Sequence, residues 1–118
     1  MREVYLDNSA TTKVCDTAVK EAVTTMVQNY GNPSSGHALG IRAENVLDES
    51  RKVVSKVIGC EPKELFFTSG GTESNNIAIF GSAEHRRKLG NKIVTTAIEH
   101  SSVLRVMEQL ENRGFEVV

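Results

Sequence analysis

The sequence predicts an α/β fold, in which a mixed or parallel sheet is flanked by helices. In the second half of the chain, apolar runs typical of strands alternate with segments of helical periodicity, in the order strand, helix, strand, helix, strand. Glycine-containing turns separate several of these segments. Because 118 residues match the common size of one domain, we expect residues 1–118 to form a single domain.

The first expected helix follows an extended amino-terminal segment. Residues 4–6 form a short strand or extended segment, and Asp16 or Thr17 caps a helix that ends near Asn29. Apolar residues recur every four positions along this helix, which is the spacing needed to cover a core. They are Ala18, Val19, Ala22, Val23, Met26 and Val27.

The second expected helix begins after a polar loop that contains glycine and proline. Ser34 or Ser35 caps this helix, which extends to about Ile58, and Gly59 closes it as a C-cap.

The remaining elements alternate between strands and helices. A compact apolar run after Pro62 predicts a strand buried on both faces. In chain order we expect a strand at 65–67, a helix at about 72–88, a strand at 93–97, a helix from Ser101 or Ser102 through Leu110, and a strand at 115–118.

Composition argues against several classes of function. The 14 basic and 15 acidic side chains give a net charge of −1, so we expect neither nucleic acid nor a membrane as a partner. The basic residues 85–88 fit a solvated helix end. Cys15 and Cys60 lack the spacing of a zinc site or disulfide framework, which indicates a reducing compartment. Without a signal-like segment, we expect a soluble, cytoplasmic protein.

The turn formed by Gly70, Gly71 and Thr72 has the properties of a phosphate site. The glycines let the backbone approach an anion, and Thr72 offers a hydroxyl and an amide at the positive end of the following helix. The turn matches neither a P-loop nor a dinucleotide-binding motif. A tight strand-to-helix turn without a ligand explains the glycines equally well. The polar run 73–76 favours a site, although Glu73 also complements the helix dipole.

Two histidines are candidates for function. His100 follows the carboxyl end of an expected strand, where ligands of α/β sheets gather. It could stack on a planar ring or move a proton, and the alternative is that it only begins a helix. His37 lies in the polar loop 32–37, and a surface or capping role explains it better than catalysis.

Taken together, four segments resemble successive signatures of the cysteine desulfurases. These are pyridoxal-phosphate enzymes of the class V aminotransferase group, with the fold-type I architecture. The segments are residues 5–12, 31–37, 67–76 and 99–103, and they span nearly the whole chain.

The resemblance implies a site and a place in the larger fold. It implies that Gly71 and Thr72 hold the phosphate of pyridoxal phosphate, and that His100 stacks on the pyridine ring and assists proton transfer. The loop 31–37 would border the substrate entrance or a dimer contact. The chain corresponds to the amino-terminal part of the family's large domain.

In an intact family member, the residues that act on the substrate come after the part that corresponds to this chain. They include the Schiff-base lysine and the cysteine that becomes a persulfide as cysteine is converted to alanine. Lys13 and Lys63 do not lie in the family's lysine motif. Cys15 and Cys60 do not lie in the family's sulfur-accepting loop. Covalent attachment through the family lysine is therefore not possible here, and we expect no independent turnover.

The resemblance leaves the partners and the role of the chain open. An intact family member passes sulfur to an acceptor or scaffold protein, for iron-sulfur cluster assembly or other sulfur transfer. For this chain we expect a homodimer or a carboxyl-terminal complement. The alternative is a non-catalytic interaction module that pairs with a separate piece or with itself, and a stand-alone binder of phosphorylated small molecules is a third possibility.

Overall fold

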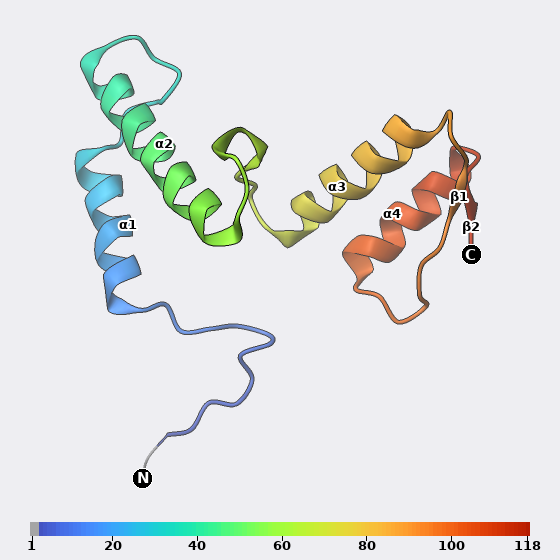
Figure 1. Ribbon diagram of the computed structural model, residues 1–118. Helices are drawn as coiled ribbons and strands as arrows, with labels where there is room; N and C mark the ends of the chain where they lie inside the picture. Colours follow the sequence, from blue (N-terminus) through green and yellow to red (C-terminus); the bar gives the residue numbers. More distant parts are fainter. Residues whose placement is uncertain (1–2) are drawn as a thin grey trace. The chain divides into compact units, whose positions relative to one another are not determined.

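The computed structural model describes residues 3–118 and contains two compact units. The amino-terminal unit extends to Leu65, and the carboxyl-terminal unit runs from Phe66 to Val118. Figure 1 shows the elements of each unit along the chain. Each unit is described by itself below.

Helix α1, Asp16–Gln28, is the first element of the amino-terminal unit. The prediction that Asp16 or Thr17 caps it is wrong, because Cys15 holds the N-cap position and Asp16 is already helical. The Asp16 carboxylate still lies in the first turn, where negative charge is favourable. The apolar stripe does not cover a core within the described residues, since α1 has no buried residue and Met26 is 75% exposed.

Helix α2, Ala38–Ile58, follows the polar loop and is the longest element. Its N-cap is His37, not Ser34 or Ser35. The two serines are turned into the loop, where the Ser34 N–H donates to Asn32 Oδ1 and the Ser35 N–H to the Asn32 carbonyl, both at 2.9 Å. The C-cap prediction is confirmed, since Gly59 has a φ of 75° and its N–H donates to the Ser55 carbonyl.

The loop between α1 and α2 packs closely on the start of α2. A Cβ at Gly40 would overlap the Ser35 carbonyl, and one at Gly31 would overlap the Leu39 carbonyl. Close approach of the backbone therefore requires glycine at both positions. A short 3-10 helix, η1 (Pro62–Glu64), ends this unit and was not predicted.

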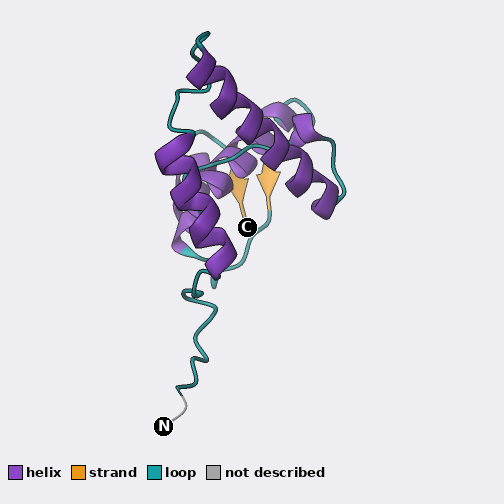
Figure 2. Ribbon diagram, turned by 90° about the vertical axis from the view of Figure 1, so that its left-hand side faces the viewer, coloured by secondary structure: helices purple, strands orange, loops and turns teal. Residues whose placement is uncertain are grey.

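The carboxyl-terminal unit consists of α3 (Gly71–Arg86), β1 (Lys92–Ile93), α4 (Ser101–Asn112) and β2 (Glu116–Val117). Strands β1 and β2 pair in parallel, with Lys92 opposite Glu116 and Ile93 opposite Val117. Figure 2 shows them side by side, connected through α4. The two strands are shorter than predicted, although the Thr95 N–H donates to the Val118 carbonyl at 2.8 Å and continues the ladder.

The core of this unit forms where α4 packs on α3 and the strands. Its buried apolar residues are Val106, Met107, Leu110 and Phe115. Three of them lie on α4 with helical spacing, so this helix supplies most of the core. Partly buried residues of α3, β1, α4 and β2 surround them, namely Ile79, Phe80, Ala83, Ile93, Val103 and Val117.

The strand expected at 65–67 is not present in the described chain. Phe66 is 77% exposed, whereas a strand covered on both faces would bury it. A strand needs a neighbour that satisfies its backbone groups, and the sheet of the described residues contains β1 and β2 without residues 65–67. The following helix begins at Gly71 and ends at Arg86, within two residues of the prediction.

Within residues 3–118, no helix combines the length and the apolar character that a bilayer crossing requires. The predicted α/β class holds for the carboxyl-terminal unit, which combines a parallel strand pair with packed helices.

Candidate functional site

The amino-terminal end of α3 presents unbonded backbone amides. Gly70 is the N-cap, and the first intrahelical hydrogen bond runs from the Ser74 N–H to the Gly70 carbonyl at 3.1 Å. The amides of Gly71, Thr72 and Glu73 precede that bond and lie at the positive end of the helix. Gly71 and Thr72 are exposed. This helix end can therefore donate hydrogen bonds to an anion.

Packing within the described chain does not explain the paired glycines. A Cβ at Gly70 or Gly71 would meet no atom within 4 Å. Neither glycine lies in the left-handed region of positive φ that favours glycine; Gly70 is extended, with a φ of 164°. The missing side chains leave the backbone amides uncovered, and this fits a bound phosphate.

Side-chain hydrogen bonds hold the loop before α3 in place. The Glu73 carboxylate accepts from the Ser69 hydroxyl at 2.7 Å and from the Ser69 N–H at 2.6 Å. These bonds stabilise the ionised form and lower the pKa of the Glu73 carboxyl. The hydroxyls of Thr68 and Ser74 lie 2.7 Å apart beside the Gly70 carbonyl. The loop is thus ordered by its own polar side chains.

His100 is the N-cap of α4. Its Nδ1 accepts from the Ser102 N–H at 3.1 Å and lies 2.8 Å from the Ser102 hydroxyl oxygen. Ser102 is buried, with 6% of its surface exposed, whereas His100 is exposed. The imidazole therefore caps α4 through Nδ1, and its Nε2 edge is left for other contacts.

A hydrogen bond between helices brings the two candidate groups to the same end of the unit. Asn75 Nδ2 on α3 donates to Ser102 Oγ on α4 at 2.8 Å. The two helices run side by side in the same direction (Figure 1), so their amino-terminal ends are neighbours. Thr72 precedes Asn75 by three residues and shares its helix face.

Sequence reasoning missed Asn75 and the role of Ser102. The polar run 73–76 indicated that this helix end faces a site, and Ser102 was considered only as a possible first residue of its helix. No local pattern pairs two residues that are 27 positions apart.

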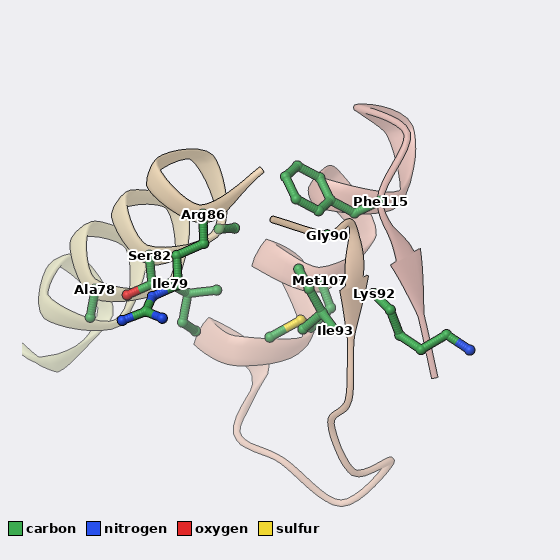
Figure 3. A pocket seen from close by; sticks show the side chains of 10 residues that line it. Ala78, Ile79, Ser82, Arg86, Gly90, Lys92, Ile93, Met107 and Phe115 are labelled. Atoms are coloured by element: carbon green, nitrogen blue, oxygen red, sulfur yellow. The ribbon is translucent and has the colours of Figure 1, made fainter. Parts of the chain in front are cut away.

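A separate pocket of about 490 Å³ lies on the flank of α3, β1 and α4. Figure 3 shows Ile79 and Ala78 of α3 facing it from one side and Met107 of α4 from another, while Lys92 points away. Lys92 is instead paired with Glu116 at 2.6 Å. Gly71, Thr72 and His100 do not line this pocket.

The other candidates have structural roles. The Nδ1 of His37 accepts from the Gly40 N–H at 3.2 Å, which confirms the capping alternative.

Within the described residues, no group of three or more His, Cys, Asp or Glu side chains could hold a metal ion. Cys15 and Cys60 are free thiols. Arg87, the C-cap of α3, donates to the Arg113 carbonyl at the end of α4, at 2.7 Å, so one member of the basic cluster links the ends of two helices.

Comparison with known proteins places this geometry in a family. The family model described as Aminotransferase class-V matches residues 4–118. The NifS/IcsS protein homolog of Lactobacillus delbrueckii subsp. bulgaricus is 47% identical over 114 residues, covering 97% of this chain and 30% of that protein. The cysteine desulfurase IscS of Pseudoalteromonas translucida is 45% identical, covering 97% of this chain and 29% of that protein.

Solved structures give the same result. A NifS-like protein matches 99% of this chain with a TM-score of 0.90 and 43% identity, over 32% of its own length. DndA from Streptomyces lividans matches 97% of this chain with a TM-score of 0.77 and 43% identity, over 32% of its length. The predicted fold class is confirmed by these matches. The chain spans about 30% of the length of the curated relatives.

Proposed function

Because the chain belongs to the aminotransferase class-V family, we propose that residues 66–118 form part of the pyridoxal-phosphate site of a cysteine desulfurase. The observation that supports this most is the Asn75 to Ser102 hydrogen bond, which joins the amino-terminal ends of α3 and α4. It brings an anion-binding helix end and an exposed imidazole to the same end of one unit.

Each part of the site has a role that its chemistry supports. The amides of Gly71 and Thr72, with the Thr72 hydroxyl, would bind the cofactor phosphate, because they lie at the positive end of α3. His100 would stack on the pyridine ring and hold or move a proton at its free edge. Pyridoxal phosphate supplies the electron sink for amino-acid chemistry, and this chain would bind and orient it.

The full reaction is proposed for a protein of the relatives' length. That reaction converts cysteine to alanine and leaves sulfur as a persulfide for transfer to an acceptor protein. The chain spans about 30% of the length of these relatives. The family resemblance implies that the reactive lysine and cysteine lie in the part of those relatives that this chain does not cover. We therefore propose that these residues alone bind the cofactor phosphate without converting cysteine.

Calorimetry with pyridoxine phosphate tests the phosphate site. This probe has no aldehyde, so it cannot react with surface lysines. We expect the chain to bind it more tightly than unphosphorylated pyridoxine, and Thr72→Ala to weaken binding about tenfold or more, as expected for a lost hydrogen bond to a charged group. Thr17→Ala is a matched control, because Thr17 is the second residue of α1 as Thr72 is of α3. Equal affinity for the two probes, or equal effects of the two variants, would contradict the proposal.

A second proposed role is association with another protein segment. Large apolar side chains are exposed in both units, including Val57 at 81% in the amino-terminal unit and Leu89 and Ile98 at 83% and 93% in the carboxyl-terminal unit. Exposed apolar groups favour a partner, which we propose to be a carboxyl-terminal complement or a second copy of the chain. Light scattering over a concentration series tests self-association, and a monomer whose mass does not change with concentration would exclude the second copy.

A further inference from the structure

The hydrogen bonds around His100 determine which of its nitrogens carries the proton. The Ser102 N–H can only donate, so the Nδ1 atom 3.1 Å away must accept with its lone pair. A neutral imidazole with a lone pair on Nδ1 carries its hydrogen on Nε2. The capping bond therefore selects the Nε2–H tautomer.

The same reasoning orients the Ser102 hydroxyl. Its oxygen lies 2.8 Å from Nδ1, which has no hydrogen to donate in this tautomer, so the hydroxyl donates its single proton to Nδ1 and shares the one lone pair there with the Ser102 N–H. The oxygen is then left with lone pairs, one of which accepts from Asn75 Nδ2 at 2.8 Å. The amide of Asn75 cannot be reversed without placing two acceptors against each other.

We propose that Asn75 and Ser102 are positioning residues that hold His100 as the Nε2–H tautomer, which leaves its Nε2–H edge free to donate beside a ligand that the ring stacks on. This proposal rests on the proposed function of the site. Directional hydrogen bonds run from Asn75 through Ser102 to His100, so the helix that carries Thr72 also orients the ring. The phosphate end of a ligand and its ring end are thereby held in a fixed relation.

Burial makes this arrangement specific to Ser102. Ser102 is 6% exposed. Every buried side-chain polar atom in the described part of the chain has a hydrogen-bond partner. Water has little access to replace Asn75 as a donor to the Ser102 oxygen. The bond from Asn75 is therefore expected to strengthen the orientation of the hydroxyl toward Nδ1.

Nitrogen NMR of the histidine-labelled chain tests the proposal directly, since long-range proton–nitrogen spectra distinguish protonated from unprotonated ring nitrogens. Only the signals of neutral rings are compared, because a doubly protonated ring has no tautomers. We expect His100 to show an unprotonated Nδ1 and a protonated Nε2. Ser102→Ala should reduce the tautomer ratio about fivefold, as expected for the loss of one ordinary hydrogen bond. Asn75→Ala should change it in the same direction by a smaller factor.

Two controls accompany these variants. Asn76→Ala removes the neighbouring amide, which bonds to the Thr72 carbonyl within α3, and should leave the His100 signals unchanged. The signals of His37, whose Nδ1 caps α2 in the other unit, should stay constant in every variant.

A protonated Nδ1 in the unsubstituted chain would overturn the proposal, and so would unchanged His100 signals in both Asn75→Ala and Ser102→Ala. The measurement needs no ligand, so its failure is distinguishable from failure of phosphate binding by Thr72. If Ser102→Ala fails to fold, the spectrum of the unsubstituted chain and that of Asn75→Ala still decide the matter.

Discussion

Asn75 and Ser102, on different helices and 27 positions apart, form a 2.8 Å hydrogen bond that joins the ends of α3 and α4. One partner is buried and the other is partly buried. We expect this bond to contribute to the stability of the carboxyl-terminal unit as well as to its site.

A double-mutant cycle measures that contribution. Asn75→Ala and Ser102→Ala should be coupled by about 1 kcal/mol in the free energy of unfolding, because each removes the same buried hydrogen bond. Urea unfolding of the two single variants and the double variant gives the coupling. Strictly additive effects would show that the bond does not contribute.

Leu110 of α4 is fully buried in the core of the carboxyl-terminal unit. Leu110→Ala should lower the free energy of unfolding of this unit by about 2–5 kcal/mol, since it removes buried methyl groups and leaves a cavity. Leu89→Ala is the matched control, because Leu89 is 83% exposed and its loss should change stability by less than about 0.5 kcal/mol. The free energy of unfolding is measured by chemical denaturation. Similar losses in the two variants would contradict the assignment of Leu110 to the core.

Much of the secondary structure could be predicted from the sequence, because its signals are local. The end of α2 followed from Gly59, and the start of α3 followed from the glycine pair. The caps of α2 and α4 were harder to predict. His37 and His100 accept through Nδ1, and this depends on a side-chain rotamer that residue type does not specify.

Features that need a distant partner could not be predicted. The apolar run 65–67 has strand composition, but a strand forms only where another strand supplies its hydrogen bonds. The arrangement of the candidate site could not be predicted for the same reason. The residues Gly71, Thr72 and His100 were candidates from their local sequence, whereas the bond that brings their helices together is visible only in the fold.

The loop before α2 gives a test of close backbone packing. Gly40→Ala should destabilise the amino-terminal unit by about 1–3 kcal/mol, because the added Cβ overlaps the Ser35 carbonyl. Gly36→Ala adds the same atom in the loop before α2, where it meets nothing within 4 Å, and should be close to neutral. Amide hydrogen exchange in α2 compares the two, and equal protection in both variants would contradict the packing account.

The hydrogen bonds between Glu73 and Ser69 predict how the stability of α3 changes at acidic pH. Its pKa is lowered in the folded chain, so its hydrogen bonds with Ser69 stabilise the fold above the ordinary pKa of 4.5. That stabilisation is lost as the pH falls from 4.5 through the lowered value. Glu73→Gln should therefore reduce the acid dependence of α3 stability, and Ser69→Ala should reduce it partly. Unfolding followed across this acid range checks both, and an unchanged dependence in Glu73→Gln would refute the prediction.

Phosphorus NMR of pyridoxine phosphate tests the central claim most directly, because it observes the group that α3 is proposed to bind. Titration with the chain should shift or broaden the phosphorus signal, and Thr72→Ala should abolish most of the change while Thr17→Ala retains it. An unchanged phosphorus signal, or the same change with Thr72→Ala as with the unsubstituted chain, would contradict the assignment of this helix end as the phosphate site.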